Sequence, residues 1–142
     1  MRLRRAICLA IIAVMYITTV TACRAEENDV PPVELLEYTY TEQIAATLTI
    51  SGNRATASGM IIPHNSQRTS VTVYLQRSTT GTSGWTSIGS WSGSSSGGTS
   101  EASGSKTISK GYYYRTYVVG KVYDSAGNVI ETVTKTSSKK HY

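Results

Sequence analysis

Apolar and polar residues alternate with a period of two over much of the chain after residue 44. The clearest case runs from Val71 to Gln76, where every second side chain is aliphatic. A similar alternation over Ala46–Ile50 resumes over 55–61 after the turn residues Ser51–Asn53, which predicts a β-hairpin. No window has the 3.6-residue period of an amphipathic helix. The pattern therefore predicts strands and turns along this whole part of the chain.

The middle of the chain is rich in tryptophan, serine and glycine. The segment Trp85–Trp91 predicts a short strand, and we expect a β-bulge in it because Trp85 and Ile88 differ in parity. Ser92–Ser100 consists almost entirely of serine and glycine, which predicts a loose loop or a weak edge strand. A modest strand is expected over 101–109.

The last third of the chain predicts a second hairpin. Tyr112–Tyr123 has the pattern of a strand, 124–128 contains turn residues with a glycine, and Val129–Thr136 forms the return strand. One face of the first strand would carry Tyr114, Thr116, Val118, Gly120 and Val122. The other face would carry Tyr113, Arg115, Tyr117, Val119, Lys121 and Tyr123.

These segments amount to about seven to eight short strands with turn signals every 8–12 residues, which is the spacing of a sandwich or barrel. The segment Lys110–Val119, with its turn and Thr/Val-rich return strand, resembles the last two strands of immunoglobulin-like and fibronectin type III-like domains. In those families a tyrosine at the start of the penultimate strand pins the chain through its hydroxyl. The resemblance implies this role for Tyr114, with Tyr112 as second choice. We therefore expect an all-β fold, an antiparallel immunoglobulin-like β-sandwich.

A more specific resemblance is to small secreted β-sandwich proteins of Gram-positive bacteria. They share a leader, an Ala-x-Leu-x-Ile-Ser-Gly hairpin, a Trp-x-x-Ile/Val-x-x-Trp-Ser-Gly segment and a Lys-Gly-x-x-Tyr-Arg strand. The matching segments here are Ala46–Gly52, Trp85–Gly93 and Lys110–Arg115, within a resemblance that covers most of residues 38–137. It implies secretion and the sandwich fold, and it implies no activity.

The beginning of the chain has the layout of a secretory signal peptide. Arg2, Arg4 and Arg5 precede a run of 17 uncharged, mostly apolar residues over 6–22, and small and polar residues follow. A run of that length is near the lower limit for a retained transmembrane anchor, and we favour cleavage. The expected organisation is a signal peptide over 1–25, an acidic extended lead-in over 26–37 and a β-sandwich domain over 38–142.

Cys23 allows two interpretations of the cleavage zone. It lies close to a cut after Ala25, as a small residue at the processing site. The four residues Val20–Cys23 also resemble a bacterial lipobox, in which the cysteine is lipidated and becomes the first residue of a membrane-anchored lipoprotein. We favour the first interpretation. Mass spectrometry distinguishes them, because a mature N-terminus at Glu26 without an acyl chain excludes lipidation.

The leader also distorts the apparent charge of the chain. The formal net charge is +5 overall, but the residues from 26 onward contain ten basic and nine acidic side chains, a net charge of +1. Residues 26–42 hold six of the acids and no base, whereas residues 43–142 hold ten bases and three acids. A near-neutral mature chain without a recognisable module motif argues against nucleic-acid binding.

The groups that catalysis needs are scarce after the leader. There are two histidines, His64 and His141, and no cysteine, so the common zinc sites cannot form. Gly-Ser-Ser-Ser-Gly around Ser95 matches the nucleophile motif only formally, because no helix follows it. The late carboxylates Glu101, Asp124 and Glu131 form no glycosidase pair or calcium loop in sequence. We expect no catalytic residue, no metal and no cofactor.

Binding is easier to support than catalysis. The expected interaction surface is an amphipathic, cationic strip of residues Tyr113, Arg115, Tyr117, Lys121 and Tyr123. The alternative is that these side chains only stabilise the sheet by cross-strand pairing. Trp85 and Trp91 are candidates for stacking on sugars, although we expect at least one of them to belong to the core.

The sequence thus favours a secreted, non-enzymatic module that binds an extracellular protein or a surface polymer. A carbohydrate-binding module using Trp or Tyr rings and a secreted antimicrobial or toxin-like protein are the alternatives. A membrane contact is expected only if the leader is retained or Cys23 is lipidated. The sequence gives no ligand and no oligomeric state.

Overall fold

The computed structural model describes residues 38–142, which form strands, turns and loops. The predicted signal peptide, Cys23 and the acidic lead-in lie outside the described residues. Within the described part, no helix is long and apolar enough to cross a membrane. The strands are β1 (Thr41–Ser51), β2 (Arg54–Pro63), β3 (Arg68–Ser78), β4 (Thr86–Ser95), β5 (Ser100–Thr107), β6 (Tyr113–Tyr123), β7 (Val129–Thr136) and β8 (Lys140–His141).

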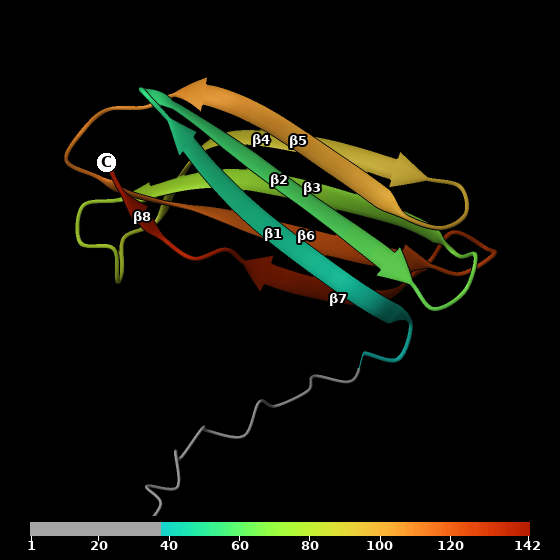
Figure 1. Ribbon diagram of the computed structural model, residues 1–142. Coiled ribbons are helices and arrows are strands. Elements are labelled where there is room, and N and C mark those ends of the chain that lie inside the picture. Colours follow the sequence, from blue (N-terminus) through green and yellow to red (C-terminus); the bar gives the residue numbers. More distant parts are fainter. Residues whose placement is uncertain (1–37) are drawn as a thin grey trace, which may run out of the picture. The chain divides into compact units, whose positions relative to one another are not determined.

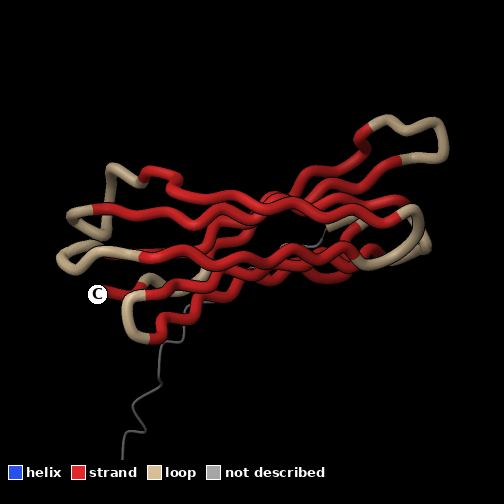
Figure 2. The backbone as a smooth tube through the Cα atoms, turned by 90° about the horizontal axis from the view of Figure 1, so that it is seen from above, coloured by secondary structure: helices blue, strands red, loops and turns tan. Residues whose placement is uncertain are grey.

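The strands form two antiparallel sheets packed face to face. One sheet has the order β1-β2-β5, and the other has the order β4-β3-β6-β7, with β8 paired to the beginning of β6. Figure 1 shows the three-stranded sheet crossing in front of the larger one at an angle, as expected for two twisted sheets. Figure 2 shows the two layers from above. The predicted antiparallel immunoglobulin-like sandwich is confirmed.

The core lies between the sheets and follows the predicted alternation. On β3 and β6 every second side chain is buried, and on β2 the inward positions are buried as well. Since the chain contains no phenylalanine, aliphatic side chains fill most of this space. The buried apolar side chains are Ile44, Leu48, Ala55, Ala57, Ile61, Val71, Val73, Leu75, Ile108, Tyr114, Val118, Val122 and Val133.

Tyr114 is the largest fully buried side chain, and it ties the entry of β6 to the segment before it. Its hydroxyl donates to the carbonyl oxygen of Ser109 (2.8 Å) and accepts from the Ser109 N–H (3.1 Å). The ring carries apolar surface into the core while the hydroxyl is fully paired. The implied pinning role of Tyr114, rather than Tyr112, is therefore confirmed.

The first part of the Ser/Gly tract is an edge strand of the larger sheet, which is the second of the two predicted alternatives. β4 continues to Ser95, and only residues 96–99 form the loop before β5. A Cβ on Gly93 would collide with the carbonyl oxygen of Glu101, and one on Gly104 would collide with the Trp91 ring. Glycine is required here because β4 and β5 approach closely where the two sheets meet along one side. The bulge is where the parity predicted it, at Ile88, which has no partner on β3.

On the opposite side of the sandwich, Glu131 joins β7 to the beginning of β1. Its carboxylate accepts hydrogen bonds from the N–H of Thr39 (2.8 Å), the N–H of Tyr40 (3.2 and 3.3 Å) and the hydroxyl of Thr41 (2.6 Å). The hydroxyl of Thr41 belongs to a buried residue, so this side of the sandwich is closed by a charge-assisted network.

Candidate interaction surface

The outer face of the larger sheet carries the predicted strip and is referred to below as the Tyr/Arg face. Each strip residue faces away from the core, because its neighbours along β6 are the buried ones. Cross-strand partners complete the face in rows, for example Ser90–Tyr74–Tyr117–Thr136. No Asp or Glu occupies any of these outward strand positions. They are Arg68, Ser70, Thr72, Tyr74, Gln76, Ser87, Ser90, Ser92, Ser94, Tyr113, Arg115, Tyr117, Val119, Lys121, Tyr123, Val129, Thr132, Thr134, Thr136 and His141.

Arg115 is held in one orientation by two neighbours. Its guanidinium carbon lies 4.1 Å from the centroid of the Trp85 ring, and its Nε donates to Oε1 of Gln76 at 2.8 Å. Gln76 in turn donates to the hydroxyl of Ser87 at 3.3 Å. The terminal nitrogens of Arg115 make no hydrogen bond with residues 38–142, so a preoriented pair of N–H donors remains for a ligand.

The middle of the Tyr/Arg face is aromatic and neutral. The rings of Tyr74 and Tyr117 are cross-strand neighbours with centroids 6.2 Å apart and an interplanar angle of 35°. Thr72 and Val119 form the next row, with Ser92 donating to the Thr72 hydroxyl at 3.2 Å. This part of the face combines ring surface with hydroxyl groups.

The far end of the Tyr/Arg face is cationic again. The guanidinium of Arg68 lies 5.1 Å from the ring centroid of Tyr123, whose hydroxyl is 2.9 Å from that of Ser70. Lys121 is exposed in the row beside Ser70. A polar hollow of about 380 Å³ adjoins this end and is lined by Ser66, Gln67, Arg68, Ser96, Tyr123, Asp124, Ser125 and Gly127.

Tyr113 differs from the other strip residues because it is already covered. The His141 ring of β8 lies 4.6 Å from its ring centroid, and the ammonium of Lys139 lies 5.7 Å away. Gly81 of the β3–β4 loop also packs directly on the ring. Tyr113 therefore joins the loop and the last strand to the sheet, which corresponds to the cross-strand alternative.

The two tryptophans have different positions. Trp91 points inward from β4, is partly buried and packs against the core and Gly104. It fulfils the expectation that at least one tryptophan belongs to the core. Trp85 precedes β4 and has one ring face under Arg115, so its part in the Tyr/Arg face is to orient that side chain.

Sequence reasoning identified the strip on β6 but not its partners on β3. Arg68, Tyr74 and Gln76 are each opposite a strip residue, and their contribution depends on the β3–β6 register. The outward parity of 74 and 76 was visible in the alternation of β3. The pairing that brings Gln76 to Arg115 was not, because 39 residues separate them.

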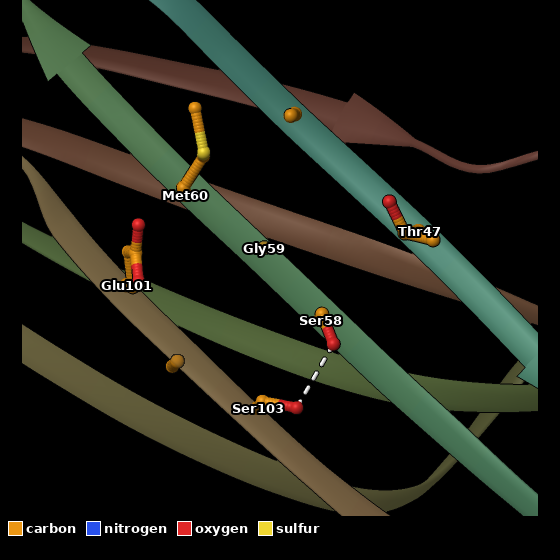
Figure 3. A pocket seen from close by; sticks show the side chains of 8 residues that line it. Thr47, Ser58, Gly59, Met60, Glu101 and Ser103 are labelled. Carbon is orange, nitrogen blue, oxygen red and sulfur yellow. Dashed lines mark hydrogen bonds between the residues drawn. The ribbon is translucent and has the colours of Figure 1, made fainter.

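A second hollow lies on the outer surface of the three-stranded sheet. It has a volume of about 410 Å³ and is lined by Ala45, Thr47, Ser58, Gly59, Met60, Glu101, Ala102 and Ser103. Figure 3 shows the hydroxyls of Ser58 and Ser103 bonded to each other, at 2.9 Å, with Met60 and Glu101 towards the other end. The hollow arises from small side chains, and Glu101 is its single ionisable group.

Three other titratable groups, His64, Glu131 and Asp124, are engaged in local structure. His64 Nε2 lies 3.3 Å from the carbonyl oxygen of Tyr38, and Glu131 binds the same entry segment through Thr39–Thr41. Asp124 belongs to the β6–β7 turn. Within residues 38–142, no three His, Cys, Asp or Glu side chains are close enough together to hold a metal ion.

The carboxylate of Asp124 organises the β6–β7 turn, and we predict a titration that reports on it. The Asn128 side-chain amide and then the Asn128 backbone N–H lower the pKa of Asp124 below its ordinary value of 3.8, with smaller contributions from Ala126 and Gly127. A lowered folded pKa adds stability above the ordinary pKa, and this is lost as the pH falls through the folded value. The stability difference between wild type and Asp124→Asn should therefore shrink on acidification.

Nuclear magnetic resonance checks this directly. The Asp124 carboxyl and the amides of Ala126 and Asn128 should titrate together, with a midpoint below 3.8. Thermal unfolding of wild type and Asp124→Asn at pH 7 and pH 2.5 gives the accompanying stability difference. A midpoint at or above 3.8 would contradict the role assigned to the turn.

Comparison with known proteins adds no family to this description. No protein-family model matches the chain, and no curated protein matches its sequence. The function is therefore inferred from the chemistry of the Tyr/Arg face.

Proposed function

We propose that the protein is an exported, non-enzymatic binding module and that the Tyr/Arg face is its binding surface. The observation that carries this proposal is the Arg115 guanidinium, fixed between Trp85 and Gln76 on a face without carboxylates. Such a group costs little conformational entropy to immobilise on binding, because it is already ordered. The export of the protein rests on the leader.

The state of the other polar groups supports binding rather than catalysis. The carboxylates of Glu131 and Asp124 already accept several hydrogen bonds each from the turn or entry segment that they hold. A nucleophile or general base needs a poised partner within hydrogen-bond reach in a cleft. The Tyr/Arg face instead offers ring surfaces, hydroxyls and cations over an extended area.

The test compares two faces of the same domain. A triple variant, Arg115→Gln, Tyr117→Ala and Lys121→Gln, removes three accessible residues of the strip, whereas Arg54→Gln removes one exposed cation from the three-stranded sheet. Protein recovered after expression of the full chain is labelled and applied to intact cells and insoluble envelope polymers of the producing culture. We expect retention of the triple variant to fall at least about tenfold and that of Arg54→Gln to stay unchanged.

Thermal unfolding of both variants accompanies the binding measurement, so that loss of binding can be separated from loss of the fold. A folded triple variant that is retained as well as wild type would contradict the assignment of the Tyr/Arg face.

A further inference from the structure

We propose that the ligand of the Tyr/Arg face is a linear acidic polysaccharide, a polymer of sugars with carboxylates at intervals, lying along β6. This inference rests on the proposed binding function and names its ligand class. Three features of the Tyr/Arg face indicate this class of ligand: the positions of its cations, the groups between them and the scarcity of exposed aliphatic side chains.

The guanidinium of Arg115 is arranged to bind a carboxylate. A guanidinium with its Nε engaged by Gln76 and one face covered by Trp85 has its terminal nitrogens left as parallel donors. That geometry suits the two oxygens of a carboxylate, which a guanidinium binds through two parallel hydrogen bonds. The absence of Asp and Glu from the outward strand positions of this face makes it complementary to negative charge.

The three cations of the face are widely spaced along β6. Lys121 is six residues from Arg115 along the same strand, and Arg68 is level with Tyr123, two residues further on. At about 3.4 Å per residue these separations are about 20 Å and 27 Å. A small anion cannot reach both ends of the face, so the complementary ligand is a polymer.

The same spacing distinguishes between polymers. Double-stranded DNA carries one charge per about 1.7 Å of its axis, far denser than three cations over about 27 Å. Between the cations lie Tyr74, Tyr117 and Thr72, which provide ring surface and hydroxyl groups. Widely spaced cations on the protein suit a polymer whose acidic sugars are separated by neutral ones. The tyrosine rings and hydroxyl groups between the cations can stack on and hydrogen-bond to the neutral sugars.

The scarcity of exposed aliphatic side chains bears on whether the partner is a protein. Stable protein interfaces have an apolar core with a few buried anchors. Within residues 38–142, Val129 is the only large hydrophobic side chain that is exposed. Val129 is level with Tyr123 at the end of the Tyr/Arg face, whereas the part between Arg115 and Lys121 has no exposed aliphatic side chain, which favours a hydrated polymer over a protein surface.

The hollow beside Arg68 and Tyr123 extends the path of the polymer. Its lining continues the Tyr/Arg face into the β2–β3 and β6–β7 loops and includes Asp124, whose carboxylate suits a neutral sugar at this end rather than an acidic one. The side-chain oxygen of Gln67 is buried there and has no hydrogen-bond partner within the described residues. A sugar hydroxyl in this hollow would supply the missing donor once the Gln67 side chain turns towards it.

The experiment measures affinity for immobilised polymers of defined chemistry. The acidic polysaccharides are hyaluronan, alginate and polygalacturonate; the comparison polymers are dextran, carboxyl-reduced polygalacturonate, poly-L-glutamate and single-stranded poly(dT). We expect at least one acidic polysaccharide to bind at least about tenfold more tightly than every comparison polymer. Free glucuronate should compete poorly, because one sugar cannot span Arg115 and Lys121.

Two substitutions test the geometry. Arg115→Lys keeps the charge but removes the paired donors, and it should weaken binding at least about tenfold, whereas the control Arg54→Gln should bind like wild type. The triple variant of the proposed function should also lose binding. Thermal unfolding establishes that each variant is folded.

Several results would overturn the inference. They are equal binding of native and carboxyl-reduced polygalacturonate, tightest binding to poly-L-glutamate or poly(dT), no binding to any of the three acidic polysaccharides, and a folded Arg115→Lys variant that binds like wild type. In these cases the envelope experiment decides whether the proposed function survives. It survives if the triple variant still loses retention on the envelope, and it fails together with the inference if retention is unchanged.

Discussion

Replacing Gly93 by alanine should destabilise the protein by about 3 kcal/mol or more, or prevent it from folding. The added methyl group would collide with the carbonyl oxygen of Glu101, which is backbone and cannot move aside as a flexible side chain would. Relief requires β4 and β5 to separate, and that would also disturb the contact between Trp91 and Gly104. Typical domains have about 5–15 kcal/mol of stability, so the loss would be a large fraction.

Urea unfolding of Gly93→Ala beside Gly97→Ala measures this effect. Gly97 lies four residues further along the same tract, and its added Cβ would make only an ordinary contact with the carbonyl oxygen of Ser66. The control should change stability by no more than about 0.5 kcal/mol. Equal unfolding midpoints for the two variants would mean that β4 and β5 do not touch at Gly93.

Replacing Glu131 by alanine should cost about 2–4 kcal/mol. The carboxylate is the acceptor for two backbone N–H groups and the hydroxyl of Thr41, which belongs to a buried residue. Hydrogen bonds to a charged group each contribute about 1.5–3 kcal/mol, and a buried donor left without a partner adds its own penalty. Part of the loss is offset where water reaches Thr39, which is exposed.

Glu131→Gln keeps an acceptor oxygen and should lower the free energy of unfolding less than Glu131→Ala does. The control Glu101→Ala changes an exposed residue and should have almost no effect on that free energy. Chemical denaturation gives the three stabilities. Hydrogen exchange gives a local measure, because the Tyr40 amide should lose protection in Glu131→Ala. Unchanged protection of that amide would show that Glu131 does not hold the entry to β1.

The parts of the fold that were predictable are those set by local alternation. The turn after Ser51, the faces of β6 and the limits of β7 agree with expectation, because one buried face fixes the phase of each strand. The bulge at Ile88 followed from the same parity argument. Residues close together in the sequence are sufficient to specify these features.

The features that the sequence did not reveal are long-range ones. The sequence left Ser92–Ser95 open between a loop and a weak edge strand, and it is strand because β3 pairs with it and β5 requires its glycine. The Glu131 network joins residues about ninety positions apart. The strip on β6 was visible, but the role of Tyr113 depended on β8, which the basic end of the chain did not predict.

The tie between β8 and β6 has a mechanical consequence. The N–H of Tyr142 donates to the carbonyl oxygen of Tyr112, and β8 pairs with the beginning of β6, whereas β1 begins at the other end of the sandwich, beside Pro63. Figure 1 shows these two points at opposite ends of the long axis. A pulling force applied between Thr41 and Tyr142 would therefore act along the strands and load many backbone hydrogen bonds in shear at once, rather than opening them one after another.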